Sequence, residues 1–428
     1  MDSKGDLYIV VSSYPYGHAE PFLETELRHI HNQFDKIYIL IPDFGKLKNP
    51  ISRFWMPENA VLIKLFRLKN AAYFLRFFLN IFKQSIIEEF YHLKFSYKLK
   101  FNFSNIKTIL SFASTGDRFA KDFEKILSEN GHTKTGATIY SYWLTDAVWG
   151  LVQIKKKFPH LNVCTRVHGW DCFFYRDKNN YLPLRKAICN TLDYVCPVSK
   201  AGRDYLLSKI PQINPDKIRL HYLGVDDSSP VDYILYKEGK LRLVSIAYVH
   251  HVKRLHLLIE ALALIEDVEI EWTHIGAWSE ATAWHKQYAV DLLGKKKNVV
   301  FNSLGEFTIQ EVRAYLDENN ADFLINVSES EGLPVSMMES LAAGVPVIST
   351  AVGGVPEIIA HKFNGFLMSQ NPNANEIALF LLEVSKLSMK EYELMAVNAR
   401  NDFEAKWKAS SNFITFTQRV LKKHNDYK

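Results

Sequence analysis

Short apolar runs alternate with longer helix-like stretches along most of the chain, and this alternation limits the possible folds more than any other feature of the sequence. Each run is short enough to be a buried strand, and most intervening stretches are long enough to hold a crossover helix. The runs are Leu7–Val11, Lys36–Ile41, Ala137–Tyr140, Val163–Val167, Tyr194–Pro197, Ile218–Tyr222, Leu241–Ile246, Glu269–Ile275, Val299–Asn302, Asp322–Val327, Pro346–Ser349 and Phe363–Leu367. The pattern predicts parallel α/β sheets.

The alternation is interrupted once, near the middle of the chain. The segment Gly224-Val-Asp-Asp-Ser-Ser-Pro230 is rich in turn formers and acids, as interdomain linkers often are. A length of 428 residues also suits two cores better than one. We therefore expect two doubly wound α/β domains of similar size, residues 1–223 and 224–406.

Composition places the chain among globular proteins, with 47% hydrophobic and 23% charged residues. It has neither a signal-peptide pattern at its N-terminus nor an apolar run of the roughly 18–20 residues that span a bilayer. We expect a cytoplasmic protein that is at most peripheral to a membrane. The net charge of +5 is mild for this size, and no nucleic-acid partner is expected. Free thiols are expected at Cys164, Cys172, Cys189 and Cys196.

One rival for two doubly wound domains is a dinucleotide-binding dehydrogenase. Such enzymes carry G-x-G-x-x-G directly after a strand, where glycines let the backbone approach a pyrophosphate. That fingerprint occurs nowhere in the chain, and the loop after Leu241–Ile246 contains no glycine. The dehydrogenase reading is therefore disfavoured.

The strand Asp322–Val327 leads into residues 328–346, whose sequence is S-E-S-E-G-L-P-V-S-M-M-E-S-L-A-A-G-V-P. Pro334 can open a helix at its first turn, and Gly344 can close it. The free amides and dipole of such a helix N-terminus suit phosphates, with Glu331 in the loop and Glu339 inside the helix. Alone, the two carboxylates could equally serve the helix dipole and the solvent.

The complete string, however, resembles the donor-binding motif of glycosyltransferase family 4, whose members are retaining enzymes of the GT-B fold. The resemblance implies two Rossmann-like domains facing across a cleft. It also implies that Glu331 faces the donor sugar and acts in catalysis, and that Glu339 binds the ribose hydroxyls. Gly332, Leu333, Pro334 and Val335 are the remaining donor-binding residues expected in this loop.

A second resemblance covers Val244–Arg254, which is similar to the first strand and loop of the family's second domain. An Arg and a Lys there usually grip the donor diphosphate. Lys253 fits the Lys, but Tyr248 occupies the Arg position, so Arg254, His250 or His251 is expected to compensate. A solvated cation at the start of a helix is the alternative for Lys253. Gly276 and Gly305 lie in segments that resemble the two loops around the base.

In the first domain, Gly17 follows the first strand, where the family keeps a glycine-containing loop near the donor phosphates. His168, in Arg166-Val-His168-Gly-Trp-Asp171, resembles the family's catalytic histidine that reaches the donor sugar. Most lone histidines after a strand are structural, which is the alternative here. The last helices, about 407–428, are expected to pack back on the first domain.

Two absent motifs bear on the mechanism. No D-x-D occurs to hold a metal–diphosphate complex, and no H-E-x-x-H occurs to hold zinc. We therefore expect no metal and no cofactor, with cations, amides and a helix dipole stabilising the leaving diphosphate. The acceptor hydroxyl would attack the face that the diphosphate leaves, and a donor phosphate oxygen would take its proton.

The expected function is transfer of a sugar from a UDP- or GDP-sugar to a glycan or lipid-linked acceptor, in surface polysaccharide synthesis. A GT-B sugar-nucleotide epimerase or a sugar phosphorylase would share these motifs. From a different class, a non-catalytic sugar-nucleotide-binding subunit is a further alternative. It would have little need of a sugar-facing Glu331 together with His168.

Residues 64–107 hold nine Lys and Arg residues against Glu88 and Glu89, together with twelve aromatic residues. Phe74, Phe77, Phe78 and Phe82 have helical spacing and predict an amphipathic helix, with Arg76 and Lys83 off its apolar face. Such a helix either packs into the first domain or lies on an anionic bilayer. Because similar family members often extend lipid-carried glycans, we expect contact with a membrane surface.

Overall fold

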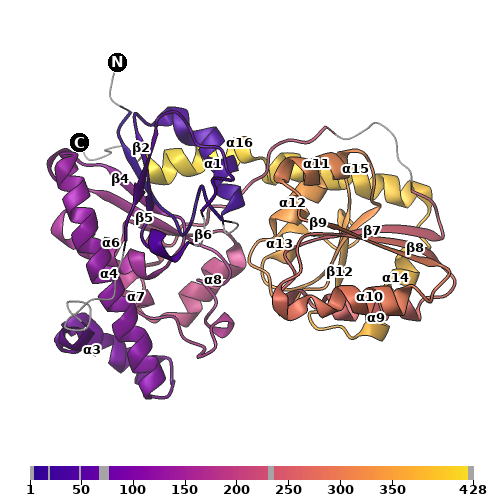
Figure 1. Ribbon diagram of the computed structural model, residues 1–428, viewed down its shortest axis with the longest axis horizontal. Helices are drawn as coiled ribbons and strands as arrows, with labels where there is room; N and C mark the ends of the chain where they lie inside the picture. The colour runs from indigo at the N-terminus through magenta and orange to yellow at the C-terminus, as the bar shows by residue number, and fades with distance from the viewer. Residues whose placement is uncertain (1–3, 18–19, 48–49, 67–76, 230–235, 423–428) are drawn as a thin grey trace. The chain divides into compact units, whose positions relative to one another are not determined.

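The computed structural model describes residues 4–17, 20–47, 50–66, 77–229 and 236–422. The chain divides into two compact units: residues 1–222 with 413–428 form the first unit, and residues 223–412 form the second. Each unit contains a six-stranded parallel sheet with flanking helices (Figure 1). The doubly wound α/β fold class predicted from the alternation of runs is confirmed.

The sheet of the first unit has the strand order β3-β2-β1-β4-β5-β6. Its strands are β1 (Leu7–Val10), β2 (Ile37–Ile41), β3 (Ala60–Lys64), β4 (Thr138–Ser141), β5 (Asn162–Val167) and β6 (Tyr194–Pro197). The expected strand at Ile218–Tyr222 is wrong: the segment has an isolated bridge between Ile218 and Val195, and two amides that donate to β6, but no strand forms. Edge strand β3 was missed: its apolar run, residues 60–63, is short, and the strand is only partly buried.

Helices α4 and α6 pack against each other, and α7 packs against α6. The helices of the first unit are α1 (Pro21–Ile30), α3 (Gln84–Tyr91), α4 (Phe103–Glu129), α5 (His132–Thr135), α6 (Asp146–Lys157), α7 (Arg185–Thr191) and α8 (Lys200–Lys209). The core beneath them includes Trp149, Phe119 and Phe123, and Gly116 and Gly150 allow α4 and α6 to approach closely. All four cysteines are free and buried, as expected.

The second unit repeats the topology, with the order β12-β11-β10-β7-β8-β9. Its strands are β7 (Lys240–Ile246), β8 (Glu269–Ile275), β9 (Val299–Gly305), β10 (Phe323–Asn326), β11 (Val347–Thr350) and β12 (Gly365–Met368). In both units the strand order reverses between the first and fourth strands, which are β1 and β4 in one and β7 and β10 in the other. Ligands of doubly wound sheets bind at the carboxyl ends of the strands at this switch point.

Helices cover both faces of the second sheet, with α9, α10 and α14 on one side and α12 and α15 on the other (Figure 1). The helices of this unit are α9 (Leu255–Leu264), α10 (Trp284–Leu293), α11 (Ile309–Asp317), α12 (Val335–Ala342), α13 (Val355–Ile358), α14 (Ala374–Val384) and α15 (Met389–Lys406). Helix α16 (Ala409–Phe416) begins in this unit and ends in the first. Capping boxes at Thr308, Asn373 and Ser388 fix where α11, α14 and α15 begin.

The chain returns to the first unit at Phe413, whereas the sequence placed the returning helices from about residue 407. The π-helical turn η9 (Thr417–Leu421) packs beside β4 and β5. Phe413 and Phe416 cover Arg166, whose guanidinium carbon lies 4.0 Å from the centre of the Phe416 ring. Arg166 is fully buried and forms an ion pair with Glu26 at 3.1 Å. The returning segment therefore completes the core of the first unit.

Of the amphipathic helix expected around residues 74–82, the described part is helical: residues 77–79 are α-helical and continue into a 3₁₀ turn. Phe74 and Arg76 lie outside the described residues, and the following turn η3 (Asn80–Phe82) ends at Lys83, whose backbone is extended. Helix α3 then begins at Gln84. Among the described residues, no helix combines the length and apolar character needed to cross a bilayer.

Candidate functional site

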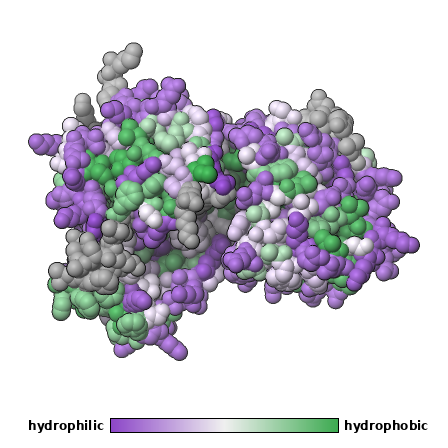
Figure 2. All heavy atoms as spheres, in the orientation of Figure 1, coloured by the Kyte–Doolittle hydropathy of each residue, from purple (hydrophilic) through white to green (hydrophobic). Residues whose placement is uncertain are grey.

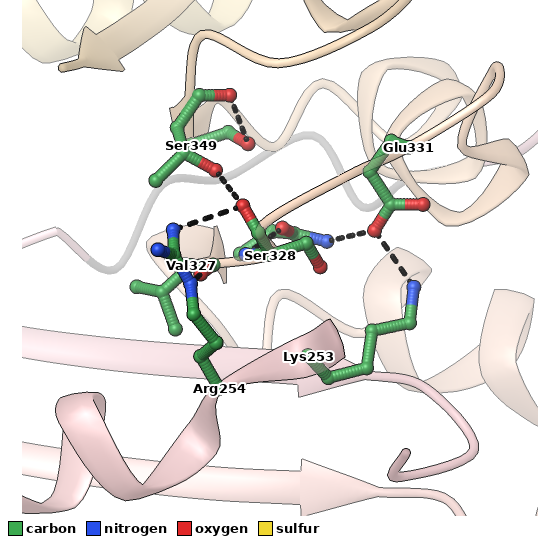
Figure 3. A network of polar contacts seen from close by, with 8 residues as sticks. Lys253, Arg254, Val327, Ser328, Glu331 and Ser349 are labelled. Carbon is green, nitrogen blue, oxygen red and sulfur yellow. Dashed lines mark hydrogen bonds and ion pairs between the residues drawn. The ribbon is translucent and has the colours of Figure 1, made fainter. Parts of the chain in front are cut away.

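The switch point of the second unit brings together two of the residues expected to act on a donor. Lys253 follows β7 and Glu331 follows β10, the two strands between which the strand order reverses. The Lys253 Nζ donates to Glu331 Oε1 at 2.7 Å, and Figure 3 shows the two side chains directed toward each other. The sequence-predicted pair is thus in direct contact.

Glu331 is held as a carboxylate although it is buried. Burial alone would raise its pKa, but the Lys253 charge and hydrogen bonds from Lys253 and Asn326 hold that pKa below its usual range. The Asn326 Nδ2 donates to the same Glu331 Oε1 at 3.0 Å, and Asn326 Oδ1 in turn accepts from the Ser328 amide at 2.8 Å. Two side chains, Lys253 and Asn326, therefore donate to the same oxygen, Glu331 Oε1, and hold the loop after β10.

Arg254 has a different place from the one expected for a phosphate-binding residue. Its backbone is left-handed (φ +48°), and its guanidinium donates to the Val327 and Ser328 carbonyls at 2.9 and 3.1 Å. It also donates to the side chain of Asn371 and to the Gln370 carbonyl. Arg254 thus braces the loop after β10 (Figure 3), and its donors are taken up by the protein.

Helix α12 begins at Val335, one residue later than the sequence suggested, with Pro334 as its N-cap. No side chain among the described residues caps this N-terminus, so its first amides have the free geometry that suits an anion. Leu333 and Val335 are buried, so any contact they make with a donor is through their backbone. Gly344, with φ +71°, follows the helix end as expected.

Glu339 lies inside α12 and differs from Glu331 in its electrostatics. Burial raises the pKa of Glu339 to about 7, with Asp226 adding to the rise and Arg313 opposing it. Its carboxyl group is therefore partly protonated near neutral pH. A group with this pKa ionises fully when a ligand supplies hydrogen-bond donors, as two ribose hydroxyls would.

Two glycines of the second unit stand where the loops around the switch point touch. A Cβ on Gly276 would meet the Ala247 carbonyl oxygen at 1.9 Å, and the Gly276 amide donates to the Gly305 carbonyl at 2.7 Å. A Cβ on Gly353 would meet the Glu331 carbonyl oxygen at 1.9 Å. The Gly354 amide, next to it, donates to the Gly332 carbonyl. These contacts require glycine. They fix the loop after β8 against the loop after β7 and the end of β9, and the loop after β11 against the loop after β10.

The position where the family usually has an Arg is open to solvent. Tyr248 is 59% exposed in the loop after β7. His250 and His251 are also exposed, and their rings lie 4.0 Å apart. Among the residues considered in this loop, only Lys253 reaches Glu331.

Two further sequence-predicted residues, Gly17 and His168, belong to the first unit. Gly17 follows β1 with φ +71°, and a Cβ there would press on Ser13 Oγ at 3.1 Å. His168 follows β5, and its amide donates to Asp171 Oδ1 at 2.7 Å. Neither ring nitrogen of His168 has a partner in the described part of the chain. Burial and the nearby Arg166 charge lower the pKa of His168 well below its ordinary value, so the imidazole is neutral.

Sequence reasoning missed Trp143, which adjoins His168, and Glu20, which binds the Trp143 indole. Glu20 is buried, accepts from the Ser12, Ser13 and Tyr14 amides at 2.6, 2.8 and 2.8 Å, and also accepts from Trp143 Nε1 at 2.9 Å. The ring of Trp143 lies 4.2 Å from that of His168. The signal was present, because an acidic residue close behind a strand-end loop can cap its amides.

Comparison with known proteins places the second unit in a described family. Residues 234–402 match the family described as glycosyl transferases group 1. The putative colanic acid biosynthesis glycosyltransferase WcaL of Salmonella typhimurium is 27% identical over 250 residues, which are 56% of this chain and 59% of that protein. The chain thus matches less than two thirds of this relative's length. The resemblance to glycosyltransferase family 4 is confirmed.

Solved structures extend the likeness over nearly the whole chain. Sucrose-phosphate synthase from Thermosynechococcus elongatus superposes with a TM-score of 0.69 at 14% identity, covering 97% of this chain and 98% of that one. Anabaena HepE in complex with UDP and glucose gives a TM-score of 0.64 at 14% identity, covering 98% and 99%. At such identities the likeness shows the fold, which is GT-B.

Proposed function

We propose that the chain transfers a sugar from a nucleotide-sugar to a glycan or lipid-linked acceptor, because residues 234–402 match the group 1 glycosyl transferases and the fold is GT-B. The relative from Salmonella typhimurium is described as a colanic acid biosynthesis enzyme, which favours a role in surface polysaccharide synthesis. The HepE structure, which contains UDP and glucose, favours a UDP-sugar over a GDP-sugar as the first donor to test.

The observation that carries the proposal is the Lys253–Glu331 ion pair at the switch point of the second unit. An ammonium group close to an uncapped helix N-terminus provides the positive charge that a diphosphate needs. Lys253 is 23% exposed at its side chain and can exchange Glu331 for a phosphate oxygen. Glu331 would then be released to accept hydrogen bonds from the donor sugar.

We propose a retaining, metal-independent reaction. The bond between the sugar C1 and the diphosphate oxygen breaks, and Lys253 and the α12 amides stabilise the negative charge that develops on the leaving group. The acceptor oxygen forms its bond to C1 on the same face, and its proton passes to a phosphate oxygen of the departing diphosphate. His168, which is neutral, would hydrogen-bond the sugar through one of its unpartnered nitrogens.

We further propose that the enzyme works on the cytoplasmic face of a membrane. Apolar side chains gather around α3 and the π-helical turn η4 (His92–Ser96), at the lower edge of the first unit in Figure 2. The membrane-facing patch consists of the exposed residues Phe78, Leu79, Ile81, Phe82, Ile87, Tyr91, Phe95, Phe101 and Phe103. Lys94, Lys98 and Lys100 are exposed beside these residues and would meet anionic headgroups.

Thermal-shift screening of the purified protein against UDP-, GDP- and ADP-sugars tests the donor, and product analysis with membrane extracts then tests transfer. Glu331→Gln should leave the shift by the nucleotide nearly unchanged and reduce turnover by at least 10-fold. Equal turnover in the variant would contradict the proposed role of the ion pair. Isomerisation of the donor without transfer would favour the epimerase, and binding with neither reaction would favour the non-catalytic subunit.

A further inference from the structure

Two tryptophans at the switch point of the first unit have no part in the donor site described above. Trp143 lies just beyond the end of β4, and Trp170 lies in the loop after β5, two residues beyond His168. The centres of the two tryptophan rings are 5.4 Å apart, with an interplanar angle of 42°. The Trp143 ring is also 4.2 Å from the His168 ring. The rings of His168, Trp143 and Trp170 therefore form one aromatic cluster, and His168 is its expected catalytic member.

This surface is partly open to solvent. Trp170 is 46% exposed and Trp143 is half-buried, whereas tryptophans are on average among the most buried side chains. Each such ring can bury about 150–250 Å² of surface when it is covered. Two neighbouring rings that stay exposed do not contribute this stabilisation to the folded protein. Such exposure is expected where a ligand packs against the rings.

Buried polar side chains hold the Trp143 ring and join the loops that carry the two tryptophans. The Glu20 carboxylate fixes the Trp143 indole at 2.9 Å and, through three backbone amides, the loop after β1. Asp171 joins the two tryptophan-bearing loops, because its Oδ1 accepts from the His168 amide and its Oδ2 from the Leu144 amide at 2.9 Å. The buried Arg185 donates to the Leu144 and Asp171 carbonyls at 3.0 and 3.1 Å.

A preorganised pair of indole faces suits a particular class of ligand. The face of an aromatic ring is electron-rich, and the axial C–H groups of a pyranose carry partial positive charge. We propose that Trp143 and Trp170 form a stacking platform for a pyranose ring of the acceptor, next to His168. This inference rests on the proposed function and names the binding surface for its second substrate.

The test uses saturation-transfer NMR on the full chain with a panel of methyl glycosides and disaccharides of hexoses, deoxyhexoses and uronic acids. Irradiation of aromatic protons should saturate ring protons on one face of at least one sugar. Trp170→Ala should weaken that sugar's binding at least 10-fold. Glu20→Gln should weaken it less, because both rings remain and the single glutamine oxygen can still accept from the Ser12 amide and the Trp143 indole.

Trp284→Ala is the matched control, since Trp284 is 55% exposed on α10 of the second unit and should leave sugar binding unchanged. Trp170→Ala should also raise the KM for the acceptor while leaving the nucleotide-induced thermal shift and the hydrolysis of donor without acceptor unchanged. A structural role for Trp170 would alter all of these together.

Sugar binding that is equal in Trp170→Ala and the wild type would overturn the platform, as would the absence of saturation transfer to any sugar of the panel. The proposed function fails separately, if no nucleotide-sugar stabilises the protein. In that case, saturation transfer that is lost in Trp170→Ala would still support a saccharide platform on the first unit.

Discussion

The two switch points of this molecule have the same strand topology and opposite chemistry. In the second unit, Lys253 and Glu331 form a partly accessible ion pair, and burial raises the pKa of Glu339 to about 7. In the first unit, the charged Glu20 is fully occupied by amides and an indole, and His168 is kept neutral. The solvent-accessible surface beside His168 is formed by the rings of Trp143 and Trp170.

This difference shows what the fold determines and what it leaves to the loops. Both sheets reverse their strand order at one point and so gather several loop ends at one edge. The residue types on those loops then select the ligand. A diphosphate needs a cation that can exchange its protein partner for a phosphate oxygen. A neutral sugar ring needs the face of a rigidly held aromatic ring and neutral hydrogen-bonding groups.

The largest effect is expected from removing the cation of the charged site. Lys253→Ala leaves the Glu331 carboxylate buried without its ion-pair partner, which typically costs about 3–5 kcal/mol of stability. It also removes a charge from the leaving diphosphate, so turnover should fall at least 100-fold. Denaturant unfolding and initial rates measure the two effects.

The double variant Lys253→Ala/Glu331→Gln serves as the control for that experiment. Neutralising Glu331 should restore most of the lost stability and none of the activity. If Lys253→Ala alone kept wild-type turnover, the second switch point would not be the donor site, and the contrast between the two units would collapse.

A large effect on rate alone is expected in the first unit. His168→Ala should reduce kcat by about 10²–10³, the range seen when one hydrogen-bonding group to a reacting centre is lost. Its nucleotide affinity, measured by calorimetry, should stay within twofold of the wild type because the proposed charged partners of the diphosphate, Lys253 and the α12 amides, belong to the second unit. A loss of nucleotide affinity as large as the loss of kcat would contradict the proposal that the second unit binds the nucleotide while His168 of the first unit acts on the sugar.

The pKa of Glu339 gives the charged site a pH dependence near neutrality. Its folded pKa, about 7, lies above the usual 4.5, so ionisation on raising the pH from about 4.5 to 7 destabilises the folded protein. Glu339→Gln should therefore stabilise the protein more at pH 8 than at pH 5, by up to about 3 kcal/mol.

Nucleotide binding should follow the same group with the opposite sign. The ionised carboxylate accepts from ribose hydroxyls, so affinity for the nucleoside should rise between pH 6 and pH 8. Using the nucleoside instead of the diphosphate keeps phosphate titration out of the measurement. The increase should disappear in Glu339→Gln, and its persistence there would assign the pH dependence to another group.

The smallest effect concerns the membrane-facing patch, which belongs to the first unit alone. Replacing Lys94, Lys98 and Lys100 by Gln should weaken binding to anionic liposomes by about 1 kcal/mol per charge at low salt. Lys83 should contribute less, because it is paired with Asp117 at 2.6 Å. The control replaces Lys295 and Lys297 of the second unit, which should have no effect. Sedimentation of the protein with liposomes measures both.

Much of this could be predicted from the sequence, and the reasons are local. Buried parallel strands are continuous apolar runs, so most of them were located, and the loop bearing Glu331 carries its own helix signals. The pairing of Lys253 with Glu331 spans two distant segments and could only be inferred through the family resemblance. Arg254 was assigned to the donor because sequence gives no direction for a side chain, and its left-handed backbone turns it toward carbonyls.

Glu20 and Trp143 were missed for another reason. Their contact joins residues that are 123 positions apart, and no spacing rule connects a loop acid with an indole on another strand. The same holds for Arg166 and Glu26, whose fully buried pairing depends on Phe413 and Phe416 to close it. Such features become visible only when the whole topology is in place.

The return of residues 413–422 to the first unit has a consequence for how the protein is made. On the ribosome, residues 4–222 emerge early, but the aromatic rings that seal Arg166 and Glu26 follow only after residues 223–412 have been synthesised. At about 5–20 residues per second, that interval lasts roughly 10–40 s. The unit translated first is therefore completed last. During this interval the Arg166–Glu26 ion pair and the surface beside β4 and β5 that η9 later covers are exposed to solvent and to the cell's chaperones.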